Sequence, residues 1–256
     1  MKKVYLFLIF VIVGIGVIMF LLFGVDSLRR EKYETALVVG DNTTWIYEKN
    51  RWLQVNNEKF NELNWQKYNV FEDNKSIGSY DLWHDDKWYI FDNDKNAVIP
   101  ENNWFAYRAN YDIEVKSFDK EELNEDKYVT SVLNDKDLSN DGKYTNAYKT
   151  SVDIDNDGVN EDFYVMSNVF SIGDYPEKIF SFVFMVKDEK IYYLYDDVRD
   201  YKAYVGCSPN LVAFLDADDD QTDEVIVSCD QYSNLGRIDM LYSFDGESFK
   251  ILISNQ

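Results

Sequence analysis

The chain has 256 residues, of which 46% are hydrophobic and 17% are Phe, Trp or Tyr, so the composition excludes a disordered chain. Its 47 acidic residues outnumber its 26 basic residues, which gives a formal net charge of -21. This charge repels a phosphate backbone and argues against nucleic acid as a partner.

The first predicted element is a membrane span. Val4 to Phe23 contains no charged residue, and as a helix at ~1.5 Å per residue it is ~30 Å long, the thickness of a bilayer core. We expect an uncleaved signal anchor, because the apolar run is longer than that of a signal peptide and ends without a small-residue cleavage site. Residues 24–34 would form a charged juxtamembrane segment.

The orientation of this span is a separate expectation. Lys2 and Lys3 precede the span and three basic residues between 29 and 32 follow it, so the local basic residues slightly favour the reverse orientation. We nevertheless place residues 1–3 in the cytoplasm, because a short N-terminus suits a signal anchor. The prediction is a single-pass protein of the cell membrane whose body is extracytoplasmic.

The body of the chain has the pattern of strands from Ala36 onward, because aromatic and β-branched runs alternate with clusters of Asp, Asn, Gly and Lys. Predicted strands are 44–47, 52–55, 87–91, 104–107 continuing through 111–115, 179–186 and 191–195. Tight hairpin turns are predicted at 188–190 and at Asp245-Gly246. Only 119–138 has helical spacing, which predicts one or two short helices. The predicted fold is all-β and mostly antiparallel, with β-rich halves at 35–144 and 145–256.

An internal repeat marks the C-terminal half. Asp153 and Asp216 each begin a loop with Asp at positions one, three and five, Glu at position nine, and a β-rich run afterwards. The offset is 216 minus 153, or 63 residues, the size of a four-stranded sheet with its loops. Each unit ends in a predicted hairpin, at 180–195 and at 238–253.

The first acidic loop has the chemistry of a calcium site. A hard cation such as Ca²⁺ takes six to eight oxygen ligands, and Asp at alternate positions of a tight turn directs several carboxylates inward. The expected ligands are Asp153, Asp155, Asp157, the backbone carbonyl of Val159 and the side chain of Glu161. Gly158 stands where the loop turns sharply. Position twelve is Tyr164 and strands flank the loop, so it is not an EF-hand.

The second acidic loop repeats this set with one change. Its expected ligands are Asp216, Asp218, Asp220, the carbonyl of Thr222 and Glu224. Gln221 replaces the glycine, at a cost of about 1 kcal/mol if the residue is left-handed, so we expect the second loop to be the weaker site. The alternative for both loops is an acidic turn held open by water and Lys. Extracellular Ca²⁺ modules bind at ~10⁻⁴–10⁻³ M, so the expected role of the metal is structural.

The pattern Asp-x-Asp-x-Asp-Gly-x-x-Glu followed by a hydrophobic strand resembles the calcium loop of FG-GAP and VCBS-type repeats of integrin-like β-propellers. The resemblance covers about residues 145–256, with the Gly missing from the second loop and Glu at position nine in both. It implies propeller-blade-like sheets joined by calcium loops, and a role in adhesion or ligand binding. The chain is too short for a seven-bladed ring, so an incomplete propeller or a curved open sheet is equally consistent with it.

Cys207 and Cys229 are an even pair in a chain expected outside the cytosol, where a disulfide is allowed. Two buried free thiols fit the sequence equally well.

The function expected from these features is non-catalytic binding at the cell surface, with a protein or a glycan as ligand. His84 is the only histidine, and no phosphate loop, HExxH or paired CxxC is present, which disfavours enzyme chemistry. Two alternatives remain open. A carbohydrate-active hydrolase would use the abundant carboxylates and aromatics. A scaffold or sensor subunit of an envelope complex would co-purify with membrane partners.

Overall fold

The computed structural model describes residues 33–100, 103–138, 147–170, 178–200, 206–231 and 236–255. In these ranges the chain consists of antiparallel strands and two short helices, which confirms the predicted mostly antiparallel β fold. The predicted span at 4–23 lies outside the described residues. Among the residues that are described, no helix is both long and apolar enough to cross a bilayer.

The N-terminal part forms one eight-stranded sheet in the spatial order β3-β2-β1-β8-β4-β5-β6-β7. Its strands are β1 (Thr35–Val39), β2 (Thr43–Tyr47), β3 (Trp52–Gln54), β4 (Gln66–Glu72), β5 (Lys75–His84), β6 (Trp88–Phe91), β7 (Ala97–Val98) and β8 (Trp104–Ala109), with helix α2 (Asn57–Leu63) between β3 and β4. The sheet curls, so that Trp88 Nε1 in β6 donates a hydrogen bond to Thr44 Oγ1 in β2 over 2.7 Å. Buried residues such as Leu82 and Trp88 form a core within this curl.

The C-terminal part forms two sheets, one for each acidic loop. The first contains β9 (Glu121–Glu122), β10 (Ala147–Val152), β11 (Glu161–Phe170), β12 (Lys178–Lys187) and β13 (Lys190–Asp200). The second contains β14 (Cys207–Leu215), β15 (Glu224–Gln231), β16 (Arg237–Phe244) and β17 (Phe249–Ser254). In both, four consecutive strands lie side by side in chain order. The sequence repeat therefore corresponds to two antiparallel four-stranded units, with β9 added to the first.

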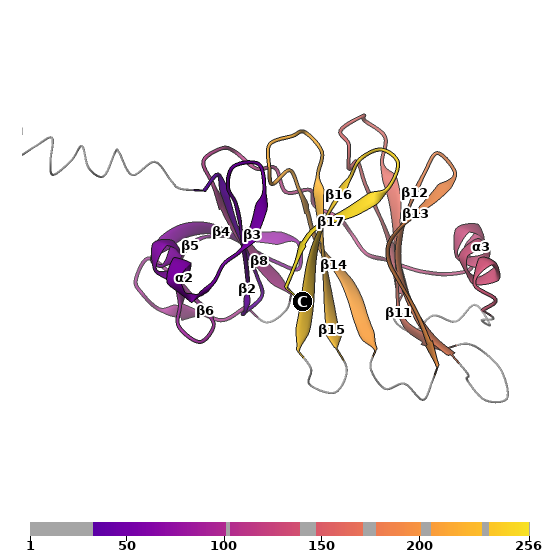
Figure 1. The fold of residues 1–256 in the computed structure, drawn as a ribbon, viewed down its shortest axis with the longest axis horizontal. Helices are drawn as coiled ribbons and strands as arrows, with labels where there is room; N and C mark the ends of the chain where they lie inside the picture. Colours follow the sequence, from indigo (N-terminus) through magenta and orange to yellow (C-terminus); the bar gives the residue numbers. More distant parts are fainter. Residues whose placement is uncertain are drawn as a thin grey trace, which may run out of the picture.

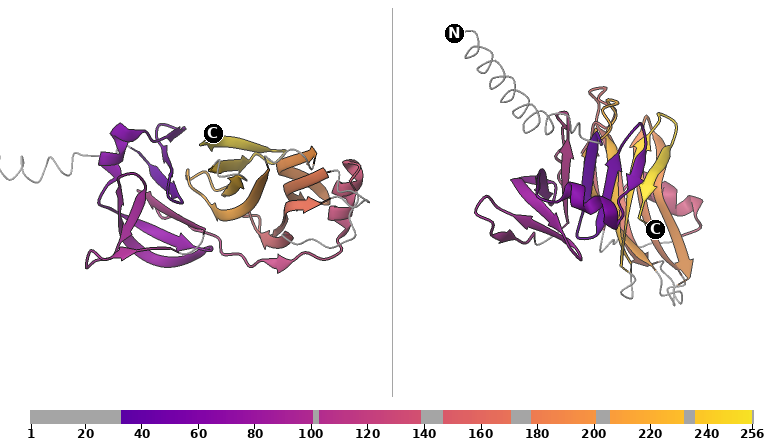
Figure 2. Two further views of the ribbon diagram at one scale, coloured as in Figure 1. Left: turned by 90° about the horizontal axis from the view of Figure 1, so that it is seen from below. Right: turned by 60° about the vertical axis from the view of Figure 1, so that its left-hand side comes forward.

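The three sheets of the described residues stack as layers, with β14–β17 in the middle (Figure 1 and Figure 2). One face of the middle sheet packs on β1, β2 and β8, where Trp45 and Ile226 share a core. Its other face packs on β10–β13, where Phe163 and Phe214 share a second core. Both faces of the middle sheet are buried, which explains its nearly continuous apolar strands. Within the described ranges the sheets do not close into a propeller ring.

Helix α3 (Lys127–Asp135) covers the outer face of the five-stranded sheet, at the end of the molecule shown on the right in Figure 1. The Asp126 side chain caps it by accepting hydrogen bonds from Tyr128 N over 2.7 Å and Val129 N over 3.4 Å. This helix confirms the prediction of a short helix within 119–138. Helix α2 was not predicted, because seven residues give only two turns, too few for a periodic apolar pattern.

The predicted continuation of a strand through residues 111–115 is wrong. Strand β8 ends at Ala109, and the following segment makes only one bridge, between Val115 and Leu215 of β14. The segment instead crosses from the first sheet to the middle sheet, and Tyr111 donates from its hydroxyl to Ala217 O over 2.5 Å. Its apolar residues Tyr111, Ile113 and Val115 pack in the core between these two sheets, whereas Asp112 and Glu114 are exposed.

A buried polar network joins the eight-stranded sheet to the middle sheet. Asp239 is 1% exposed, and its carboxylate accepts hydrogen bonds from Thr43 Oγ1 over 2.5 Å, from Arg237 Nε over 2.7 Å, and from Ser228 Oγ. Asn255 Nδ2 also donates to Thr43 Oγ1 over 2.6 Å. Thr43 belongs to the first sheet and the other residues to the middle one, so this network fixes how the two layers meet.

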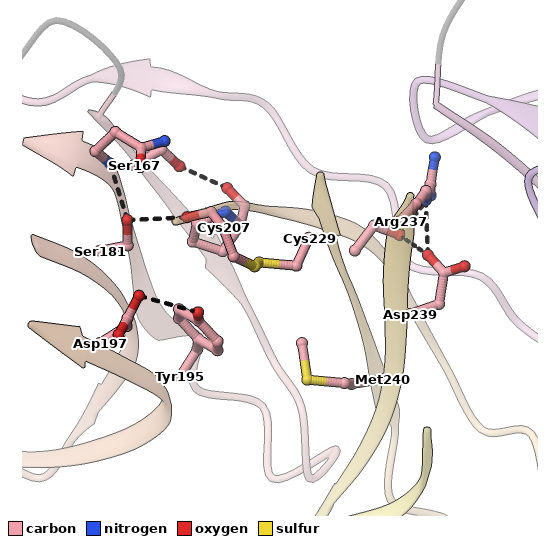
Figure 3. Close-up of a disulfide and its surroundings, with 12 residues drawn as sticks. Ser167, Ser181, Tyr195, Asp197, Cys207, Cys229, Arg237, Asp239 and Met240 are labelled. Carbon is pink, nitrogen blue, oxygen red and sulfur yellow. Dashed lines mark hydrogen bonds and ion pairs between the residues drawn. A yellow bond between two sulfur atoms is a disulfide. The ribbon is translucent and has the colours of Figure 1, made fainter. Parts of the chain in front are cut away.

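Cys207 and Cys229 form a disulfide between neighbouring strands β14 and β15, with their Cα atoms 5.4 Å apart (Figure 3). The bond lies in the core between the two repeat sheets. Nearby, Ser181 Oγ of β12 donates to the Cys207 carbonyl over 3.1 Å, and Ser167 Oγ of β11 donates to the Pro209 carbonyl over 2.6 Å. The disulfide therefore reinforces β14 where the five-stranded sheet docks on it.

Candidate metal centre

The first acidic loop connects β10 to β11, and the pairing of Val152 with Glu161 closes it. Asp153 holds the loop in shape, because its carboxylate accepts hydrogen bonds from Asp157 N over 3.1 Å and Gly158 N over 3.0 Å. Asp157 Oδ1 accepts from Val159 N over 2.8 Å. These bonds satisfy backbone donors that a tight turn would otherwise leave free.

The second acidic loop connects β14 to β15 and repeats these hydrogen bonds position by position. Asp216 accepts from Asp220 N and Gln221 N, each over 3.0 Å, and Asp220 Oδ1 accepts from Thr222 N over 2.8 Å. Gln221 has a φ of 73° and the corresponding Gly158 a φ of 87°, so both loops turn through a left-handed residue at the same place. The two loops are equivalent in conformation as well as in sequence.

Each loop brings three carboxylates together. Asp153, Asp155 and Glu161 each offer an oxygen within 4.8 Å of the others, and so do Asp216, Asp218 and Glu224. Both triads could hold a metal ion. The carboxylates of Asp157 and Asp220, also expected as ligands, accept loop N–H groups. The carbonyl ligands expected from Val159 and Thr222 stay predictions.

The first triad has an internal cation, Lys187, which no local sequence pattern predicts. Lys187 Nζ lies 2.9 Å from Asp155 Oδ2, 3.1 Å from Asp157 Oδ2 and 2.6 Å from Glu161 Oε1. Burial lowers the pKa of Lys187, but its bonds to Glu161, Asp155 and Asp157 outweigh burial and raise the pKa above its usual value. The lysine therefore stays charged and neutralises part of this loop.

The second triad has no such cation. Among the described residues, no Lys or Arg forms an ion pair with Asp216, Asp218 or Glu224. The strand register explains this difference. Asp162 pairs with Val186 and Val225 pairs with Tyr242, so Glu161 lies opposite Lys187 whereas Glu224 lies opposite Ser243.

Two carboxylate oxygens of the second triad are buried without a hydrogen-bond partner. They are Asp218 Oδ1 and Glu224 Oε1. Glu224 is 0% exposed. Burial, followed by repulsion from Asp220 and Asp216, raises the pKa of Asp218 to about 6. Burial, followed by repulsion from Asp218, raises the pKa of Glu224 to about 9. A buried carboxylate without a partner is costly, and a bound cation would remove that cost.

The two loops lie side by side, and the second one lies against the first sheet. Asn156 Nδ2 donates to Gln221 O over 3.0 Å, and Asp223 N donates to Ile154 O over 2.9 Å. Ala217 is held on both sides: its N–H donates to Glu224 Oε2 over 2.8 Å, and its carbonyl accepts from Thr35 Oγ1 over 2.8 Å. The second loop is therefore part of the contact between the first and middle sheets.

His84 has a packing role in this structure. Its ring stacks on Phe60 with centroids 3.7 Å apart and meets the edge of Trp88 at 5.2 Å. Burial lowers the pKa of His84 against the opposing effect of Asp85 and Asp86. The His84 ring is therefore part of the aromatic packing around α2 and β6.

Comparison of the chain with protein-family models, with curated proteins and with solved structures found no significant match.

Proposed function

We propose that the chain is a non-catalytic binding protein of the cell surface, stabilised by one Ca²⁺ ion in the second acidic loop. The observation that carries the metal proposal is the pair of buried, unpartnered oxygens on Asp218 and Glu224. They lie in a triad of carboxylates that pairs with no lysine in the described ranges of the chain.

Calcium is the cation that suits this triad best. All the candidate donors are oxygens, which hard cations prefer over transition metals. Asp216 and Asp218 lie in an irregular loop and Glu224 begins β15. Ca²⁺ accepts the irregular geometry of such a set, whereas Mg²⁺ requires a nearly ideal octahedron. The resemblance of the loop sequence to FG-GAP and VCBS-type repeats supports the same ion.

The first loop takes the opposite role in this proposal. Lys187 Nζ already contacts three of its carboxylates, so a divalent cation would have to displace an ammonium group and meet its repulsion. We therefore expect metal in the second loop before the first, although the glycine at 158 had favoured the first.

The proposed location outside the cytosol has two supports. The disulfide between Cys207 and Cys229 fits an oxidising compartment. The uncharged segment at 4–23 has the length of a membrane span, with the β-rich body following it. The anchored body would then meet millimolar Ca²⁺ and external ligands.

The metal proposal is tested by the thermal midpoint of the full-length chain in phosphatidylcholine nanodiscs, measured with Ca²⁺, with Mg²⁺ and with EGTA. We expect Ca²⁺ to raise the midpoint by several degrees and Mg²⁺ to have much less effect. Asp218→Asn should abolish the Ca²⁺ effect, whereas the matched variant Asp155→Asn in the first loop should keep it. An equal rise with Mg²⁺, or a Ca²⁺ effect that survives Asp218→Asn, would contradict the proposal.

A further inference from the structure

A row of aromatic side chains crosses the outer face of β4, β5 and β6. Trp65 N donates to Leu82 O over 2.7 Å, which sets Trp65 opposite Trp83, and Trp83 pairs with Tyr89. The ring centroids of Trp65 and Trp83 are 6.1 Å apart with planes 25° from parallel, and those of Trp83 and Tyr89 are 5.6 Å apart. We call these three residues the aromatic row. It lies on the face opposite the core residues Leu82 and Trp88.

The backbone at Trp65 adopts a conformation that bulky residues rarely take. Trp65 has a φ of 56°, and it is the only aromatic residue with positive φ in the described part of the chain. The other described residues with positive φ are glycines and polar residues, mostly Asn and Asp, which adopt this conformation more readily than Trp does. Its side chain is also 49% exposed, so burial does not explain the choice of Trp. Strained residues that a fold keeps exposed are frequent at binding sites.

Polar groups border the aromatic row. The next row across the same strands begins with Lys67 and Asp81. Asp81 Oδ2 accepts from Lys95 Nζ over 2.6 Å, and Lys67 Nζ donates to Asn93 Oδ1 over 2.9 Å. Lys95 Nζ also lies 4.7 Å from the Trp65 ring centroid. Flat apolar rings beside amide, ammonium and carboxylate groups form a surface that is apolar at its centre and rich in hydrogen-bonding groups at its edge.

The chemistry of this surface suits a sugar. One face of a pyranose ring consists of C–H groups, which pack on the electron-rich face of an aromatic ring, while its hydroxyls project sideways to polar neighbours. Adjacent strands are ~4.8 Å apart, about the length of one sugar unit, so three neighbouring rings could carry two or three linked units. Lys67, Lys87 and Lys95 lie among Asp81, Asp85 and Asp86 at the border, so the formal charges there balance. The chain as a whole carries a net charge of -21, which disfavours an anionic sugar or an anionic lipid surface.

We propose that the aromatic row of Trp65, Trp83 and Tyr89 is a binding site for a neutral oligosaccharide. This site is separate from the calcium proposal, because β4, β5 and β6 contribute no residue to the acidic loops. It gives the proposed binding role of the chain a class of ligand. The oligosaccharide proposal and the calcium proposal can each fail without the other.

The test is a titration of the full-length chain in phosphatidylcholine nanodiscs, which carry no sugar. The probes are neutral hexasaccharides of glucose, mannose, galactose and N-acetylglucosamine, with oligogalacturonate as the anionic comparison, followed by tryptophan fluorescence and by calorimetry. We expect saturable binding of at least one neutral probe, in Ca²⁺ and in EGTA alike, and none of oligogalacturonate. Trp83→Ala should weaken binding by about tenfold or more.

Trp65→Gly distinguishes binding from folding. Glycine accepts the positive φ, so this variant should keep its thermal midpoint within a few degrees while its sugar binding is lost. Ile251→Ala removes another exposed apolar side chain, 58% exposed on β17, and should bind as the wild type does. Absence of binding to every neutral probe, or unchanged binding in Trp65→Gly, would overturn the proposal. Self-association that Trp65→Gly abolishes would also overturn it, in favour of an interface between copies.

Discussion

At the scale of single residues, Lys187 distinguishes two loops that are otherwise alike. It contacts Asp155, Asp157 and Glu161, and Ser243 lies at the corresponding place in the second unit. Among the described residues, an ammonium group partly neutralises the first loop and none pairs with the second triad. We therefore expect the second loop to bind a metal ion more readily than the first.

Replacing Lys187 by Met, which keeps the length of the side chain, should open the first loop to metal. Without Ca²⁺ the variant should lose about 2 kcal/mol of unfolding free energy, because the carboxylate of Glu161 stays buried without its cation. Ca²⁺ should restore most of this loss and the variant should bind one more ion than the wild type. Denaturant titrations in Ca²⁺ and in EGTA measure both effects. Lys190→Met, at an exposed position across the same hairpin, is the matched control.

Replacing Glu224 by Gln should have opposite effects with and without metal. The amide keeps the shape of the side chain and removes the cost of either burying the Glu224 carboxylate or protonating it on folding, since burial raises its pKa to about 9. The amide Nε2 could also donate to the unpartnered Asp218 carboxylate. In EGTA the free energy of unfolding should therefore rise by about 2 kcal/mol. In Ca²⁺ the stabilisation by metal should disappear. A variant that is less stable than the wild type in EGTA would argue against an unneutralised carboxylate at this position.

At the level of secondary-structure elements, the two loops differ in the residue that adopts the left-handed conformation, which is glycine in the first and glutamine in the second. Gln221 has a positive φ and a side chain, whereas Gly158 has the same turn without a Cβ. Gln221→Gly should therefore raise the unfolding free energy by about 0.5–1 kcal/mol. The reverse change, Gly158→Ala, should lower it by a similar amount through strain alone, since a Cβ there would meet nothing within 4 Å. Equal signs for the two variants in a denaturant titration would contradict this explanation.

We expect the disulfide to stabilise β14 and β15 by reducing the number of conformations that the unfolded chain between Cys207 and Cys229 can adopt. Its residues are 22 positions apart, so Cys207→Ala with Cys229→Ala should cost about 3 kcal/mol of unfolding free energy. A reducing agent should produce a similar loss in the wild type and no change in the double variant. If the reducing agent has no effect on the wild type, the two cysteines do not stabilise the protein through their bond.

The sequence predicts turns and loops formed by consecutive residues well, and it predicts contacts between residues far apart in the chain poorly. The hairpin turn at 188–190 and the second one at Asp245-Gly246 are confirmed, because a tight turn depends on residues close in the chain. The acidic loops are likewise formed by consecutive residues. Lys187 is 26 residues from Glu161 and reaches it through strand register, which no local pattern reveals. An alignment of the two repeats that extends past the loops and matches Lys187 with Ser243 would reveal this lysine as a difference between them.

At the scale of the whole molecule, the layer order could not be read from the sequence. The last sheet in the chain, β14–β17, lies between the other two, because both of its faces are apolar. Continuous apolar strands such as β15 indicate burial on two sides, but they do not say which sheets cover them. The shared middle layer predicts that all three sheets unfold together in one transition.

Asp239→Ala tests this coupling between layers. Removing the carboxylate leaves Arg237 without its buried partner and breaks the bond to Thr43 in the first sheet. We expect a loss of about 3 kcal/mol and a separation of the unfolding transition into two, followed by far-ultraviolet circular dichroism and by tryptophan fluorescence, which reports mainly on the first sheet. Thr43→Val removes only the hydroxyl and should cost about 1 kcal/mol within a single transition. One undivided transition in Asp239→Ala would mean that the remaining contacts between the layers couple them without Asp239. These contacts are the apolar core and the hydrogen bonds of Thr35 and Tyr111 to the Ala217 carbonyl.

The number of Ca²⁺ ions bound per chain decides whether the second acidic loop is the calcium site. It is determined by equilibrium dialysis of the full-length chain in nanodiscs at millimolar free Ca²⁺. We expect one ion for the wild type, one for Asp155→Asn in the first loop, and none for Asp218→Asn in the second. No bound ion in the wild type, or an ion lost with Asp155→Asn and kept with Asp218→Asn, would contradict this assignment.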